Sequence, residues 1–223
     1  QSEKVILSVQ NLKVYFPAEK NILGKPTSFY KAVDDVSFEV KESETIGLVG
    51  ESGCGKTTLG RAILQLIKPT AGKIKLQGKE IQTLAQKELR SIRKDLQIVF
   101  QDPYGSLNPR ITIGNAILEP LAVHGMLQTN KERKEQVIQL LEQVNMSPDL
   151  FNRYPHQFSG GQRQRICIAR ALALKPSFLI FDESVSALDV SVQAQVLNLI
   201  NDLKNAYNFT SIFISHDLSV VHY

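Results

Sequence analysis

One segment constrains the fold of this chain more than any other: residues 50–57, with the sequence GESGCGKT. It fits the pattern G-x-x-x-x-G-K-[ST], in which backbone N–H groups of a tight loop surround phosphate oxygens. A short apolar run at 45–49 precedes the loop, and apolar residues recur at helical spacing through 57–67. A buried strand that leads into a phosphate loop and then a helix is the first unit of a parallel α/β fold.

The residue types in this loop predict a nucleotide phosphate site with a metal ion. Glycine lets the backbone turn inward, and the helix that follows adds the positive end of its dipole. We expect Lys56 to bridge the β- and γ-phosphates, Thr57 to place its hydroxyl on Mg²⁺, and Thr58 to contact the α-phosphate. The predicted cofactor-binding residues of the loop are Gly50, Ser52, Gly53, Gly55, Lys56, Thr57 and Thr58.

A second apolar run, 178–181, ends at two adjacent acids, Asp182 and Glu183. Ligands of open α/β sheets bind at the carboxyl ends of the strands, so both acids are expected beside the phosphate loop. Asp182 is predicted to hold Mg²⁺ through its water shell, and Glu183 to polarise an attacking water molecule. A solvated acidic turn is the alternative, and the four apolar residues before the acids argue against it.

The remaining chain alternates between strand and helix patterns. We expect strands within 5–16 and 36–40, joined by a loop at 17–28, and further strands at 96–100 and 211–215. Helices are expected at 161–174 and 190–205. Between 103 and 157 the helical spacing of apolar residues is interrupted by five prolines, which predicts several short helices. The predicted fold is α/β, with a mostly parallel core sheet, an N-terminal antiparallel β subdomain and an inserted helical subdomain at roughly 103–157.

Between the phosphate loop and the acid pair lies the sequence Ser159-Gly160-Gly161-Gln162, in which Ser159 is a good N-cap for a helix. With all three motifs in this order, the chain resembles the ATPase subunit of an ATP-binding cassette transporter, over nearly its whole length. The resemblance implies a P-loop NTPase cassette that hydrolyses ATP with Mg²⁺. It also implies that two cassettes pack head to tail. Residues 159–162 of one would then cap the ATP on the partner's loop, with Asp189 at the interface.

The same resemblance assigns further residues. His216 follows the strand at 211–215 and would contact the γ-phosphate and hold the water; Gln101 follows the strand at 96–100 and would reach the metal. The family stacks an aromatic side chain on adenine at the end of the first strand, which points to Phe16, with Tyr15 and Tyr30 as alternatives. The catalytic set is then Glu183, His216 and Gln101, and the metal set is Thr57, Gln101 and Asp182.

The segment 101–110, with the sequence QDPYGSLNPR, resembles the oligopeptide, dipeptide and nickel importer branch of bacterial cassettes. That branch implies a second cassette ATPase, as a homodimer or heterodimer, and two membrane permease subunits. It also implies an indirect link to an extracytoplasmic substrate-binding protein, and a peripheral location on the cytoplasmic face of the inner membrane. The alternatives are a soluble cassette ATPase acting on nucleic acid or ribosomes, and a nucleotide switch that hardly hydrolyses ATP.

Composition limits the other function classes. The net charge is +4, and the densest basic run, at 131–134, is already interrupted by Glu132, so no nucleic-acid partner is predicted. No run of eighteen apolar residues is present, which argues against a membrane span. Two cysteines, Cys54 and Cys167, are too few for a metal site or a disulfide framework.

The chain begins with glutamine and stops at Tyr223, where a cassette normally continues. We therefore expect one cassette domain, 1–223, truncated at its C-terminus.

Overall fold

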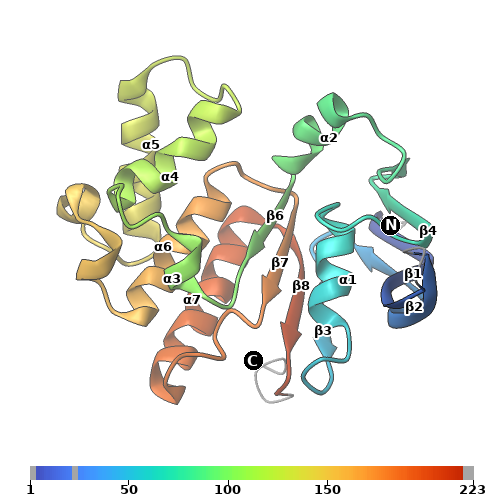
Figure 1. The fold of residues 1–223 in the computed structure, drawn as a ribbon. Coiled ribbons are helices and arrows are strands. Elements are labelled where there is room, and N and C mark those ends of the chain that lie inside the picture. Colours follow the sequence, from blue (N-terminus) through green and yellow to red (C-terminus); the bar gives the residue numbers. More distant parts are fainter. Residues whose placement is uncertain (1–3, 22–24, 218–223) are drawn as a thin grey trace.

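The computed structural model describes residues 4–21 and 25–217, which form two sheets with helices packed around them (Figure 1). The first sheet is antiparallel and has the strand order β2-β1-β4-β5. Its largest part is a hairpin of two 16-residue strands, β1 (Val5–Lys20) and β2 (Pro26–Lys41). The shorter strands β4 (Ala71–Leu76) and β5 (Lys79–Glu80) complete it.

The second sheet is parallel, with the order β3-β8-β7-β6. Its strands are β3 (Thr45–Val49), β8 (Thr210–Ser215), β7 (Phe178–Asp182) and β6 (Leu96–Val99). Because these strands are parallel, the carboxyl ends of β3, β7 and β8 meet at one edge of the sheet, although their residues are far apart in the sequence. At this edge lie the phosphate loop after β3, Asp182 and Glu183 at the end of β7, and His216 after β8.

Two hydrophobic cores lie on the two faces of the parallel sheet. Side chains alternate along a strand, so Leu179 and Phe181 of β7 join the core formed with α6 (Gly160–Leu172) and α7 (Val190–Tyr207). Phe178 and Ile180 join the other core, with α1 (Lys56–Ile63) and the antiparallel sheet. In Figure 1, α1 accordingly lies between the two sheets. The predicted fold class is confirmed: an antiparallel N-terminal sheet, a parallel sheet and helices around it.

Five short helical elements occupy the chain between Asp102 and Phe158. They are α3 (Pro103–Ser106), α4 (Ile113–Val123), α5 (Asn130–Gln143) and the 3₁₀ turns η1 (Pro148–Asn152) and η2 (Pro155–Gln157). The prolines at 103, 148 and 155 open their elements, as the missing N–H of proline allows. Pro120 behaves differently from our expectation, because α4 continues through it. Helices α4 and α5 belong to the same hydrophobic core as α6, which packs on one face of the parallel sheet. This packing holds the helical segment against that face.

Several predicted boundaries are wrong. Residues 17–20 and 26–28 of the predicted loop are strand, with Pro17 paired to Phe29, because register shifts absorb the irregular residues along the hairpin. Residues 22–24 of that loop lie outside the described residues. Strand β3 is half-exposed rather than buried, since it lies at the edge of the described sheet. Helix α1 stops at Ile63, just before Gln65 takes a left-handed φ of 56°. The segment 71–93, which holds β4, β5 and α2 (Gln86–Arg93), has no counterpart among our predicted elements. None of the described helices is long and apolar enough to cross a membrane.

Candidate nucleotide site

The phosphate loop connects β3 to α1 through a backbone that only glycine adopts easily. Gly53 and Gly55 have φ values of 81° and 96°, in the left-handed region. A Cβ at Gly55 would also lie 2.0 Å from the carbonyl oxygen of Ala32 on β2. Gly55 is therefore required twice, by its own backbone and by the close approach of the hairpin, and it forms the N-cap of α1.

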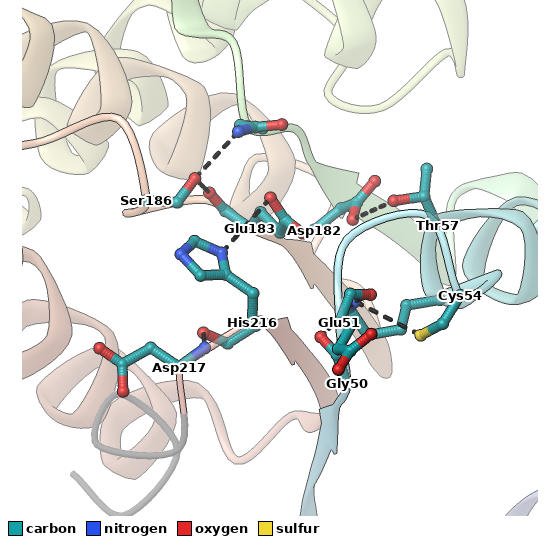
Figure 2. A network of polar contacts seen from close by, with 12 residues as sticks. Gly50, Glu51, Cys54, Thr57, Asp182, Glu183, Ser186, His216 and Asp217 are labelled. Atoms are coloured by element: carbon teal, nitrogen blue, oxygen red, sulfur yellow. Dashed lines mark hydrogen bonds and ion pairs between the residues drawn. The ribbon is translucent and has the colours of Figure 1, made fainter.

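Lys56 opens α1 and folds its side chain back into the loop. Its Nζ donates hydrogen bonds to the carbonyl oxygens of Gly50 and Glu51, at 2.7 and 2.6 Å. The same Nζ lies 3.6 Å from Sγ of Cys54 (Figure 2). The ammonium group is thus held at the centre of the loop, where a phosphate chain would lie, and the residue is only 7% exposed.

Thr57 and Asp182 meet at the edge of the parallel sheet. Oγ1 of Thr57 donates to Oδ1 of Asp182 at 2.9 Å, which joins the loop after β3 to the end of β7. Asp182 is only 5% exposed. Burial raises the pKa of its carboxyl, and the neighbouring charge of Glu183 adds to the rise; the Thr57 hydrogen bond and the charges of Arg61 and Lys56 act in the opposite direction.

Glu183 follows Asp182 in a left-handed conformation, with φ of 48°. This turn brings its carboxylate to His216, whose Nδ1 lies 3.8 Å from Oε2 of Glu183 (Figure 2). The backbone N–H of Glu183 donates to the carbonyl of Ile214 on β8, at 2.9 Å. The ends of β7 and β8 thus hold two predicted catalytic residues side by side: Glu183, which would polarise the water, and His216, which would contact the γ-phosphate.

Gln101 reaches the same region from the end of β6. Its Nε2 donates to Oγ of Ser186, at 3.0 Å, and Ser186 Oγ donates to the carbonyl of Glu183, at 2.9 Å.

A cavity of about 220 Å³ opens between the loop, the hairpin and these residues. Its lining consists of Tyr30, Ala32, Ser52, Gly53, Gly55, Lys56, Thr57, Thr58, Gln101 and Glu183.

The segment 159–162 lies elsewhere. Ser159 is exposed and caps α6: its Oγ accepts from the N–H of Gln162, at 3.3 Å, and the Gln162 side chain accepts from the N–H of Ser159, at 3.0 Å. A Cβ at Gly161 would lie 2.5 Å from Cγ1 of Val192, so glycine permits close packing of α6 on α7. Asp189 is the exposed N-cap residue of α7. None of residues 159–162, nor Asp189, lines the cavity beside Lys56.

Of the three aromatic candidates for stacking on adenine, Tyr30 lies nearest the phosphate loop in this structure, although the sequence pointed first to Phe16. Tyr30 lines the cavity, and its hydroxyl donates to the carbonyl of Gly53, at 3.2 Å. Phe16 is 38% exposed and is absent from that lining. It pairs with Tyr30 across the hairpin, so both side chains emerge on the same face. Tyr15 instead donates to Asp34, which raises the pKa of its phenol.

Comparison with known proteins establishes the family. Residues 33–186 match the ABC transporter family. The chain belongs to that family. It is 52% identical over its full length to the oligopeptide transport ATP-binding protein AppF of Bacillus subtilis (strain 168), of which it covers 68%. Over 216 residues it is 51% identical to the glutathione import ATP-binding protein GsiA of Escherichia coli O157:H7, with 97% of the chain and 34% of GsiA covered. The chain thus spans about two thirds of AppF and one third of GsiA.

Solved structures support the same assignment. The dimeric bacterial ABC transporter cassette MJ0796 is 28% identical, with a TM-score of 0.85 over 97% of this chain and 90% of that one. MJ0796 in a dimeric post-hydrolysis state, bound to ADP and Pi, has a TM-score of 0.84 at 28% identity, over 96% of this chain and 90% of that one. The chain is an ABC ATPase, and ATP with Mg²⁺ is its cofactor pair. Its cassette presents hydroxyl and carboxylate oxygens at Thr57 and Asp182, the hard donors that suit Mg²⁺.

Replacing Asp182 with asparagine is expected to stabilise the nucleotide-free cassette at neutral pH. The folded-state pKa of Asp182 lies above the unfolded value, so its ionisation costs stability once the pH exceeds the unfolded pKa. Asparagine keeps an acceptor for Thr57 without the buried charge. The melting temperature of Asp182→Asn should exceed that of the parent chain at pH 7, by about 2–4 °C per kcal/mol gained. This difference should shrink as the pH falls toward the unfolded pKa. Asp202→Asn, at an exposed position on α7, is the control.

Proposed function

We propose that this chain is the ATP-hydrolysing subunit of a membrane importer, and that peptides are its substrate class. The observation that carries the ATPase chemistry is the convergence of the β3, β7 and β8 ends, which gathers Lys56, Thr57, Asp182, Glu183 and His216. The names of the relatives support both the role in import and the peptide substrate class. They include oligopeptide transport, peptide import and glutathione import ATP-binding proteins.

In the proposed reaction, a water oxygen attacks the γ-phosphorus and the bond to the β–γ bridging oxygen breaks, which gives ADP and phosphate. Lys56 and the loop N–H groups neutralise the charge that moves onto the leaving oxygen. Glu183 orients the water and accepts its proton, and His216 holds the Glu183 carboxylate and the γ-phosphate. Thr57, Asp182 and Gln101 would hold Mg²⁺, which would supply neutralisation of the phosphate charge.

We propose further that the active unit is a pair of cassettes. The helix start at Ser159–Gln162 is a capped helix N-terminus, with Ser159 and Gln162 exposed, that does not line the nucleotide cavity of the same chain. A second cassette, identical or related, would place this helix start and Asp189 over the ATP held by its partner. The dimeric state of the MJ0796 cassette supports a pair as the active unit. The aromatic partner of adenine in this proposal comes from the hairpin face that carries Phe16 and Tyr30.

The proposed permease contact lies on the other side of Thr57. A larger cavity, of about 500 Å³, separates Arg61 of α1 from Ser106 of α3 and Arg170 of α6. Its walls come from both parts of the cassette, so a permease segment seated there would move with their relative position. The proposal includes two permease subunits and an extracytoplasmic binding protein that is linked to the cassette through them. It also places the cassette peripherally on the cytoplasmic face of the inner membrane.

Affinity capture of the full-length tagged protein from the membranes of its source organism tests the importer. We expect two multi-spanning permeases and a second cassette ATPase to be recovered with it and identified by mass spectrometry. The operon or binding protein linked to those permeases then gives the substrate. Recovery of ribosomal or DNA-repair proteins, with no membrane protein, would overturn the transport proposal and leave the ATPase chemistry in place.

Alkylation of Cys54 is expected to block nucleotide binding, and ATP is expected to protect the thiol. Cys54 is exposed, and its Sγ lies 3.6 Å from Lys56 Nζ, so an added group would occupy space needed by the phosphates. Cys167 is buried, which raises the pKa of its thiol to about 11 and keeps it unreactive. ATP binding before and after treatment with N-ethylmaleimide is the measurement, with Cys54→Ser as the insensitive control. Normal ATP binding by a chain alkylated at Cys54 would contradict the prediction.

A further inference from the structure

Ser186 connects two parts of the site through one hydroxyl group. It lies between β7 and α7, three residues after Glu183, and is partly buried. Its Oγ accepts a hydrogen bond from Nε2 of Gln101, at 3.0 Å, and donates one to the carbonyl oxygen of Glu183, at 2.9 Å (Figure 2). The backbone N–H of Ser186 donates to that same carbonyl, at 3.0 Å. The hydroxyl therefore links the end of β6 to the turn that carries Glu183.

The directions of these hydrogen bonds are fixed by chemistry. A serine hydroxyl has one proton, and a carbonyl oxygen can only accept. The proton of Ser186 is therefore committed to Glu183, and toward Gln101 the hydroxyl can only accept. Of the two ends of the Gln101 amide, only the NH₂ group can donate. The amide is accordingly held with its nitrogen on Ser186 and its oxygen directed away from it.

The position of Gln101 makes this orientation matter. Gln101 lines both cavities of the site: the one that contains Lys56, Thr57 and Glu183, and the one that contains Thr57 and Asp182. The amide oxygen is the part of this side chain that can bind a hard cation, whereas the NH₂ group would repel one. A free amide would lose affinity for a cation whenever its nitrogen faced the Thr57–Asp182 pair.

We propose that Ser186 is a positioning residue that holds the Gln101 amide with its oxygen available to Mg²⁺ beside Thr57 and Asp182. The proposal rests on the metal role of Gln101 in the proposed function. It requires no contact between Ser186 and the metal or the nucleotide. Because the Ser186 N–H keeps its own bond to Glu183, the turn at 183–186 survives the loss of the hydroxyl. Ser186→Ala therefore changes the orientation of Gln101 without unfolding the turn.

The test is equilibrium binding of a non-hydrolysable ATP analogue, titrated with Mg²⁺ and repeated in EDTA. Ser186→Ala should raise the Mg²⁺ concentration needed for half-maximal binding by about three- to tenfold, the effect of one ordinary hydrogen bond. Binding in EDTA should stay at the parent value, since Gln101 is proposed to act on the metal alone. Ser186→Thr keeps a hydroxyl and should restore the parent Mg²⁺ dependence.

Gln101→Ala separates this inference from the function on which it rests. It should raise the Mg²⁺ requirement by itself, and Ser186→Ala should then add nothing in the double variant. A normal Mg²⁺ requirement in Gln101→Ala would overturn the metal role of Gln101. A raised requirement in Gln101→Ala with a normal one in Ser186→Ala would overturn the Ser186 proposal alone. Equal weakening in Mg²⁺ and EDTA would show that Ser186 is only structural, which also overturns it.

Discussion

The Glu183→Gln variant is expected to lose ATP turnover and to accumulate as an ATP-bound dimer. Glutamine has the shape of glutamate but cannot accept the proton of the attacking water. Loss of a general base typically costs about 10²–10⁴-fold in rate. The residues proposed to hold the nucleotide and Mg²⁺ are unchanged, because the hydrogen bonds of Lys56, Thr57 and Asp182 do not involve the Glu183 side chain. The left-handed turn at this position is unaffected, since the backbone bond to Ile214 does not involve the side chain.

Two measurements are needed for this prediction: steady-state phosphate release, and size-exclusion chromatography with ATP and Mg²⁺. Where the natural partner is a different cassette, that partner is included in both. Glu142→Gln removes an exposed carboxylate on α5 and should behave as the parent chain. Turnover by Glu183→Gln within tenfold of the parent would refute the assignment of Glu183 as the base.

The second large effect is expected from Lys56→Ala, which should abolish detectable ATP binding. The ammonium group is already placed in the loop by Gly50 and Glu51, so it is available for phosphate without a large rearrangement. Each charge-assisted hydrogen bond to the phosphates contributes roughly 1.5–3 kcal/mol. Loss of the bonds to the β- and γ-phosphates should therefore weaken ATP binding by about 10²-fold or more.

Isothermal titration calorimetry with ATP measures this loss directly. Lys68→Ala makes the same change in net charge at an exposed position after α1, and its affinity should equal that of the parent chain. The melting temperature of each variant shows whether the fold is retained. Parent-like affinity in a folded Lys56→Ala protein would refute the assignment of Lys56 as a ligand of the ATP phosphates.

The motifs of this chain could be predicted because their residue types are demanded locally. A phosphate loop needs glycine at positions such as Gly55, where the backbone is left-handed and a neighbouring carbonyl is close. Strand β7 is continuously apolar because both of its faces are covered, and an acid at its end is conspicuous in the sequence. The parallel order of strands and helices follows from these units, and this part of the fold agreed with expectation.

The features that were not predicted depend on neighbours distant in the sequence. Pro17 remains in a strand because β2 continues beside it, and Pro120 remains in α4 because α5 and α6 pack around that helix. The half-exposed state of β3 depends on its place at the sheet edge, which its own five residues do not specify. Tyr30 is one of the three aromatic candidates, and no local pattern could rank it against Phe16, because the hairpin register places it at the cavity.

The strand order β3-β8-β7-β6 also determines when the site can form during synthesis. Strand β3 pairs with β8, whose first residue is Thr210, and β6 pairs with β7, whose first residue is Phe178. A nascent chain makes about 5–20 residues per second, so the phosphate-loop strand waits on the order of ten seconds or more for its partner. Throughout that time its edge is open to other chains. Ribosome-bound chains that end before β8 should consequently depend on chaperones, whereas chains that expose β8 beyond the ribosome should bind ATP.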